Sequence, residues 1–145
     1  MPQPQTLDTA IQGSCLCGAV RYEITGHLGI FQYCRCSRCQ KTSGSAMAAN
    51  LFTLPDQFHW IDGEMLIGRF EPAGAKHFAT AFCTRCGSMV PWMGKSGKAM
   101  VVPAGSLDGH PGIKPVQTIF AGSQAEWFVE PTERPRYEAM PPRKG

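Results

Sequence analysis

The arrangement of seven cysteines constrains this 145-residue chain more than any other feature of its sequence. The cysteines fall into three groups with the spacings CxC, CxCxxC and CxxC: Cys15 and Cys17, then Cys34, Cys36 and Cys39, then Cys83 and Cys86. Such spacings are typical of metal sites, and an odd number does not suit a full set of disulfides. The alternative, buried free thiols that act as small hydrophobic side chains, does not account for the clustering. We therefore predict that thiolates bind zinc here.

The first and last groups resemble each other, because a glycine directly follows each one (Gly18 and Gly87). Sulfur atoms around one tetrahedral zinc lie about 3.8 Å apart, whereas alternate side chains on a flat strand lie roughly 6.5 to 7 Å apart. Both segments must therefore be tight turns, which glycine permits. We pair the two groups as one closed structural site, with the ligands Cys15, Cys17, Cys83 and Cys86. The weaker alternative joins the first group to the central one and leaves the last group short of ligands.

The central group keeps three ligands, and a fourth coordination position open to a small molecule is usual for a catalytic zinc. We predict that Cys34, Cys36 and Cys39 hold this second ion. Three thiolates around Zn²⁺ carry a net charge of about −1, which nearby cations would offset. The same stretch contains Arg35, Arg38 and Lys41, followed by the small residues Ser43 and Gly44. We expect Arg38 and Lys41 to steer an anionic substrate, and Ser43 and Gly44 to let it approach; a solvated surface and an ordinary loop are the alternatives.

Composition favours short strands over long helices, because 16 glycines and 12 prolines separate short apolar runs. The length suits one domain at 13–129, with a flexible tail at 1–12 and a charged, proline-rich extension at 130–145. We expect one hairpin of 19–25 with 30–33, another around Asp62-Gly63, and a single helical turn at 37–42 capped by Ser37. Further strands are expected at 46–52, 76–82, 88–92, 100–103 and 116–121.

The roles of the histidines and tryptophans are less well specified by the sequence. Each of the histidines (His27, His59, His77 and His110) has a side chain suited to a general base, but no spacing supports any one of them. The three tryptophans, Trp60, Trp92 and Trp127, are expected in the core.

Charge and hydropathy narrow the class of protein. A net charge of +3 without a basic run gives no nucleic-acid footprint, and no apolar segment reaches membrane-spanning length. The N-terminal residues hold no apolar secretory segment, so we expect a soluble cytoplasmic protein. The expected partner is a small thiol. The oligomeric state stays open, a homo-oligomer included.

Four segments resemble the glutathione-dependent formaldehyde-activating enzyme family, which also includes centromere protein V. They are GSCLCGAVRYEI at 13–24, CRCSRCQKTSGS at 34–45, FCTRCGS at 82–88 and AGSLD at 104–108. The resemblance implies a mainly β fold of the β-tent type, made of small antiparallel sheets pinned by a four-cysteine zinc site. It also implies two zinc ions per chain, a structural ion on Cys15, Cys17, Cys83 and Cys86 and a catalytic one on Cys34, Cys36 and Cys39.

Family members are described as carbon–sulfur lyases that join formaldehyde to glutathione as S-(hydroxymethyl)glutathione. The chain departs from the family near its C-terminus. Where the family often has His-Ile-aromatic and then Lys-Ala-Pro-Trp, this chain has Thr118-Ile119-Phe120 and Gln124-Ala125-Glu126-Trp127.

The sequence thus predicts a zinc-dependent carbon–sulfur lyase that acts on a thiol adduct of a small aldehyde, with a glutathione-like substrate. The alternative is a zinc-stabilised module that binds a protein partner and catalyses nothing.

Overall fold

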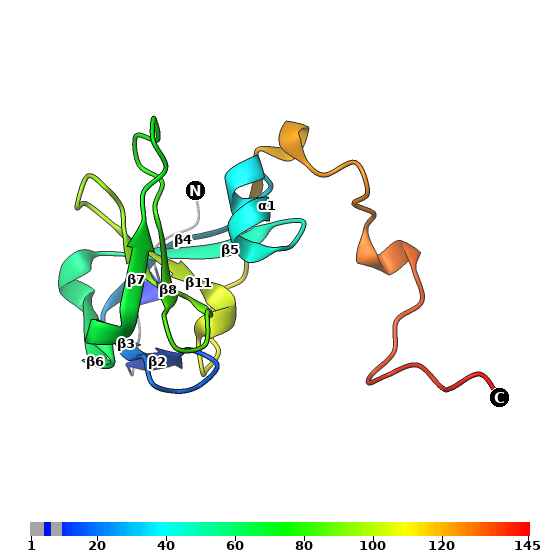
Figure 1. Cartoon of the computed structure of the whole chain (residues 1–145), viewed down its shortest axis with the longest axis horizontal. Helices are drawn as coiled ribbons and strands as arrows, with labels where there is room; N and C mark the ends of the chain where they lie inside the picture. Colours follow the sequence, from blue (N-terminus) through cyan, green and yellow to red (C-terminus); the bar gives the residue numbers. More distant parts are fainter. Residues whose placement is uncertain (1–4, 7–9) are drawn as a thin grey trace.

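The computed structural model describes residues 5–6 and 10–145. These residues form three small β-sheets and a single α-helix, α1 (Figure 1). The mainly β architecture predicted from the sequence is confirmed.

The largest sheet has six strands. Five follow one another across the sheet, and the sixth pairs with β4 in parallel, in contrast to the antiparallel pairs elsewhere. In spatial order the five are β1 (Gln5–Thr6), β4 (His27–Cys34), β5 (Ala48–Thr53), β11 (Met100–Pro103) and β10 (Trp92–Met93), and the sixth is β12 (Thr118–Ile119).

Two three-stranded antiparallel sheets complete the domain. One contains β2 (Ile11–Ser14), β3 (Arg21–Ile24) and β6 (Phe58–Asp62), and the other contains β7 (Ile67–Phe70), β8 (Thr80–Cys83) and β9 (Met89–Val90). Short 3₁₀ turns link the strands: η1 (Pro55–Gln57), η2 (Glu64–Leu66), η3 (Ala104–Ser106), η4 (Ala121–Ser123) and η5 (Pro131–Glu133).

Helix α1 (Ser37–Ser43) is the expected helical turn, but its cap differs from the prediction. The N-cap is Cys36, whose sulfur accepts a hydrogen bond from the backbone N–H of Cys39 at 3.4 Å. A thiol that caps a helix is fixed in orientation by that helix. The helix ends at Gly44, which takes a left-handed conformation with φ of 64°.

Both predicted hairpins are wrong, although a tight turn exists at each place. Gly26 and Gly63 have positive φ values of 75° and 78°, but the strands on either side enter different sheets. Strand β3 pairs with β2 and β6, while β4 pairs with β1, β5 and β12. Burial explains the choice, because pairing β3 with β6 stacks Tyr22 on Phe58 with ring centroids 5.3 Å apart.

Two hydrophobic clusters form the core. The first lies between the β2–β3–β6 sheet and the large sheet and includes Tyr22, Ile24, Leu28 and Leu51, all fully buried. The second contains Val20, Ala79, Val90, Trp92 and Val101 together with two of the cysteines, Cys15 and Cys83. The expected structural site is therefore continuous with the core.

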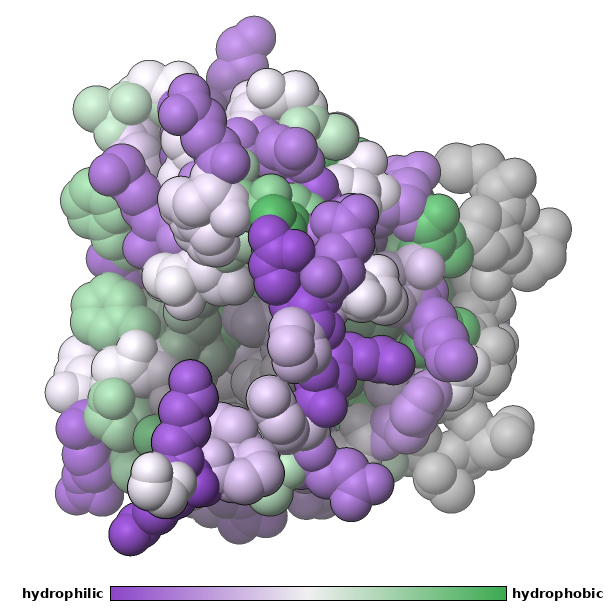
Figure 2. Space-filling model, turned by 90° about the vertical axis from the view of Figure 1, so that its right-hand side faces the viewer, coloured by the Kyte–Doolittle hydropathy of each residue, from purple (hydrophilic) through white to green (hydrophobic). Residues whose placement is uncertain are grey.

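The C-terminal segment leaves the body of the domain beyond α1 and extends away from it (Figure 1). The face of the molecule on that side is largely hydrophilic with separate hydrophobic patches (Figure 2). Trp127, expected in the core, is instead 69% exposed.

The expected tail at 1–12 lies mostly outside the described residues, and its described parts belong to β1 and to the start of β2. Among the described helices, none has the length and apolar character needed to cross a bilayer.

Candidate metal centres and the adjoining cavity

The first centre gathers the four thiols predicted as a structural site. One Sγ atom from each cysteine lies within 4.8 Å of all the others. The Cys15 and Cys17 sulfurs are 3.6 Å apart, and those of Cys17 and Cys83 are 3.9 Å apart. Both distances match the edge of about 3.8 Å expected for four sulfurs around one zinc. The donor set and its spacing thus fit a zinc ion held by Cys15, Cys17, Cys83 and Cys86.

Two glycine turns create this spacing, as the sequence predicted. Gly18 and Gly87 each have a φ of 78°, in the left-handed region that favours glycine. Their N–H groups donate to the carbonyl oxygens of Cys15 at 3.0 Å and Cys83 at 2.7 Å. Each turn therefore brings two thiols of one short segment to the same point.

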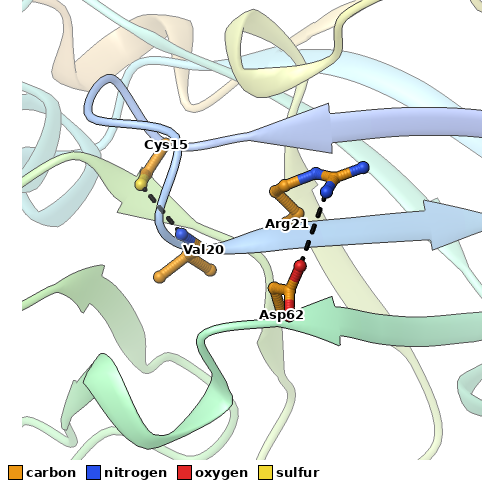
Figure 3. A network of polar contacts seen from close by, with 4 residues as sticks. All are labelled: Cys15, Val20, Arg21 and Asp62. Atoms are coloured by element: carbon orange, nitrogen blue, oxygen red, sulfur yellow. Dashed lines mark hydrogen bonds and ion pairs between the residues drawn. The ribbon is translucent and has the colours of Figure 1, made fainter.

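A backbone donor and a serine hydroxyl contact these sulfurs. The Val20 N–H donates to the Cys15 sulfur at 3.3 Å (Figure 3). The Ser88 hydroxyl accepts from the Leu16 N–H at 3.0 Å and lies 3.2 Å from the Cys86 sulfur, so it links the two turns.

An ion pair lies beside this centre. Arg21 and Asp62 approach to 3.4 Å between β3 and β6 (Figure 3), but both side chains are about half exposed or more, at 46% and 64%. Solvent-exposed pairs of this kind contribute little to stability.

The second centre gathers the other three thiols, and their sulfur atoms also lie within 4.8 Å of one another. Cys34 ends β4, Cys36 caps α1 and Cys39 lies in its first turn. They pack against Ala48, Phe78 and Ile119 in a small cluster of their own. Three thiols are one donor short of a tetrahedral set, and they also fit zinc.

The thiols of each centre differ in acidity. Burial raises the pKa of Cys39 and of Cys34, and for Cys39 the neighbouring thiols raise it further. Burial also opposes ionisation of Cys36, but the N–H of Cys39 and neighbouring groups outweigh it and lower its pKa. Hydrogen bonding to Ser88 lowers the pKa of Cys86 to about 5. Crowded thiols cannot all ionise together unless a cation sits among them, which is the chemistry of a metal site.

A cavity of about 930 Å³ adjoins the three-cysteine centre and not the four-cysteine centre. Its lining includes Cys34, Cys36 and Cys39 together with side chains from β5, β10, β11, β12 and the segment between β7 and β8. Figure 1 shows α1 and the β7–β8 segment on the same side of the large sheet. The apolar part of the lining consists of Phe52, Phe78, Trp92, Val101, Ile119 and Phe120.

Arg35 ties the C-terminal segment to the cysteine loop. Its guanidinium donates to Gln124 Oε1, lies 3.7 Å from the Glu130 carboxylate and stacks 4.1 Å from the centre of the Phe128 ring. The side chain is only 12% exposed, and its buried Nε has no hydrogen-bond partner among the described residues. Its backbone N–H donates to Ile119 at 3.1 Å. Arg35 thus lies outside the lining of the cavity and holds the segment that supplies part of the cavity wall.

The predicted substrate-binding residues divide into two groups. Arg38 lines the cavity, with its guanidinium carbon 5.9 Å from the centre of the Phe78 ring. Lys41, Ser43 and Gly44 lie outside the lining, and the Ser43 hydroxyl donates to the Cys39 carbonyl at 2.6 Å. Of the four histidines, His77 is the one in the lining.

Sequence reasoning missed much of the lining, namely Lys76, Phe78 and the segment 119–123. Phe78 and Trp92 pack together with ring centroids 5.6 Å apart, so Trp92 belongs both to the core and to the cavity wall. For an isolated aromatic residue in a strand-like run, the sequence does not indicate whether the side chain packs in the core or lines a cavity.

Comparison with known proteins places the chain in a family. The family described as glutathione-dependent formaldehyde-activating enzyme matches residues 10–123. The chain belongs to this family. A crystal structure of a protein from Rhodobacter sphaeroides is similar in fold, with a TM-score of 0.55 and 21% identity, over 74% of this chain and 98% of that one. No curated protein matches the chain.

In this member of the formaldehyde-activating family, the matched region 10–123 contains both converged thiol clusters. The departures noted at 118–120 and 124–127 fall in the segment that Arg35 holds, and the family match ends within it, at residue 123.

The two centres predict different consequences for loss of one cysteine. Binding of a structural zinc contributes about 10 to 16 kcal/mol, comparable to the whole stability of a domain at about 5 to 15 kcal/mol. Cys83 is fully buried in the core, so Cys83→Ala should give an unfolded or insoluble chain. Cys36→Ala should stay folded, because it removes one helix cap at a cost of about 1 kcal/mol and one ligand of a site outside the main core. Thermal melts followed by circular dichroism measure both. Equal melting temperatures for the two variants would contradict this assignment.

Arg35→Met should release the C-terminal segment without unfolding the domain. The variant loses the contacts to Gln124, Glu130 and Phe128, so backbone amides at 124–130 should exchange with solvent faster, while zinc content stays the same. Hydrogen exchange read by mass spectrometry measures this. Arg85→Met is the matched control, since Arg85 also directly precedes a cysteine but is exposed. Unchanged exchange at 124–130 in Arg35→Met would show that other contacts hold the segment.

Proposed function

We propose that this protein is a zinc-dependent carbon–sulfur lyase that acts on the thiol adduct of a small aldehyde, similar to S-(hydroxymethyl)glutathione synthase. One observation carries the proposal: of the two thiol clusters, the three-cysteine cluster lines a cavity large enough for a substrate. Cavities of about 300 to 1,000 Å³ are typical of small-molecule sites. The family, which is named for activating formaldehyde with glutathione, supports the same reaction class.

Two zinc ions are assigned to the chain under this proposal. Cys15, Cys17, Cys83 and Cys86 hold the structural ion, and Cys34, Cys36 and Cys39 hold the catalytic one. A zinc ion in the three-cysteine centre supplies Lewis-acid chemistry and favours the thiolate form of a substrate thiol. We take 13–129 as the zinc-binding domain and 130–145 as an extension.

The reaction needs no oxidant or reductant. In the synthetic direction one sulfur–carbon bond forms between the thiol and the carbonyl carbon, and the thiol proton ends on the resulting hydroxyl group. The lyase direction reverses both changes. The cavity residues orient the thiol toward the three-cysteine centre, and His77 is the imidazole in the lining suited to take up and return that proton.

The cations around the centre have separate roles. Arg38, in the lining, contacts a substrate carboxylate, whereas Lys41, at the last turn of α1, adds to the positive field that attracts it. Ser43 and Gly44 shape the end of α1: the Ser43 hydroxyl donates to the Cys39 carbonyl, and the Gly44 N–H donates to the Gln40 carbonyl. We place the protein in the cytoplasm, because all seven cysteines are free thiols that a reducing compartment preserves.

Metal removal separates this enzyme from a zinc-stabilised binding module. The chain should bind two zinc ions, and a mild chelator should remove one of them, with loss of formaldehyde consumption in the presence of glutathione but with an unchanged circular dichroism spectrum. The reason is that the three-cysteine centre lacks a fourth protein ligand and opens on a cavity, while the four-cysteine centre has a full set of ligands, two of them buried in the core. Elemental analysis and a formaldehyde assay measure the result. One inert ion, or two equally inert ions, would indicate the binding module.

A further inference from the structure

Apart from the three thiols, the charged side chains that line the cavity are cationic. They are Arg38 and Lys76, and among the described lining residues none is aspartate or glutamate. Such a cavity attracts a carboxylate and offers no carboxylate to an ammonium group. Glutathione carries two carboxylates and one ammonium group, so its ammonium would enter a site without a charged acceptor.

The remaining wall is apolar and largely aromatic. Phe78 and Trp92 pack at an interplanar angle of 57°, and Phe52 and Val101 continue this surface along the neighbouring strands. Covering apolar surface of this kind with an apolar ligand is favourable, because it removes that surface from water. A polar tripeptide leaves most of that favourable burial unused.

The segment after β12 adds an aromatic ring at the edge of the cavity. Phe120 is 62% exposed and has a φ of 54°, which makes it the one described residue other than glycine with a positive φ. A residue other than glycine is strained in this region and keeps the conformation only where its surroundings impose it. Here the Arg35 contacts impose it, because they hold the segment on both sides of the ring. An exposed ring held in this way is suited to contact an apolar ligand.

We propose that the cavity binds a thiol that joins an apolar group, aromatic or branched aliphatic, to a single carboxylate, and that it prefers such a thiol to glutathione. The inference rests on the proposed function, since it takes the substrate sulfur to the three-cysteine centre. The carboxylate faces Arg38 and Lys76, and the apolar group lies against Phe78 and Trp92.

The test uses the full chain loaded with cobalt(II), whose absorption spectrum changes when a thiol binds to the three-cysteine centre. Four probes are titrated: 2-mercapto-3-phenylpropionate, its neutral amide, 2-mercaptopropionate, which lacks the ring, and glutathione. The phenyl acid should bind about tenfold or more tightly than each of the others, because only this probe satisfies both the apolar wall and the cations.

Variants separate the contribution of the apolar wall to binding from that of the cations. Phe78→Ala should weaken binding of the phenyl acid by about tenfold and leave binding of 2-mercaptopropionate unchanged. Phe78→Leu, which preserves the core packing, should weaken binding of the phenyl acid less. Arg38→Gln combined with Lys76→Gln should weaken both acids and spare the amide. Lys98→Gln is the matched control, because Lys98 lies on the same loop as Ser96 and Ala99 but outside the lining.

Failure of the proposed ligand class and failure of the proposed function give different results in this titration. If glutathione binds as tightly as the phenyl acid, or the amide as tightly as the acid, the proposed ligand class is wrong while the thiol-binding function stands. If no thiol changes the cobalt spectrum, the proposed function fails as well.

Discussion

The convergence of four sulfur atoms between the glycine turns at Gly18 and Gly87 is the contact on which this fold depends. It joins segments 66 residues apart, as the Cys17–Cys83 contact shows, and two of its cysteines lie in the second core cluster. The sheets are small, and several strands have only two residues, so hydrogen bonds within each sheet provide limited stability. A metal ion bound at this junction between the sheets would compensate for that limit, because the free energy of metal binding is available only to the folded chain.

The three-cysteine centre also gathers thiols from separate positions in the chain, but it lies beside a cavity. Its cysteines come from the end of β4 and the start of α1, and their outer side faces a cavity. Arg35, between two of these cysteines, holds the chain at 119–130 beside the same cavity. Movement of that segment would change both the wall of the cavity and the surroundings of the cysteine loop. Phe120 lies within this held segment, and the contacts that hold the segment explain why Phe120 keeps a positive φ.

Local chemistry in the sequence was sufficient to predict the thiol clusters. The cysteine spacings and the glycines after them specify turns whatever the surrounding topology, and both turns are confirmed. Pairing between strands was not predictable in the same way. Asp62-Gly63 signals a turn, but whether β6 pairs with β7 or with β3 depends on burial of Tyr22, a residue distant in sequence.

The cavity wall was also beyond local reasoning, because it assembles from several strands and two connecting segments. Arg35 shows the same limit. Its position beside two cysteines suggested a role in charge balance, but its contacts lie with Gln124, Phe128 and Glu130, far along the chain.

X-ray absorption at the zinc edge tests the division of the cysteines most directly. We expect two zinc ions per chain, one with four sulfur ligands and the other with three sulfur ligands and one oxygen or nitrogen ligand. The zinc–sulfur distances should be about 2.3 Å, and no zinc–zinc scattering should appear. A spectrum of one zinc with four sulfurs, or of two zinc ions bridged by shared sulfurs, would contradict the account.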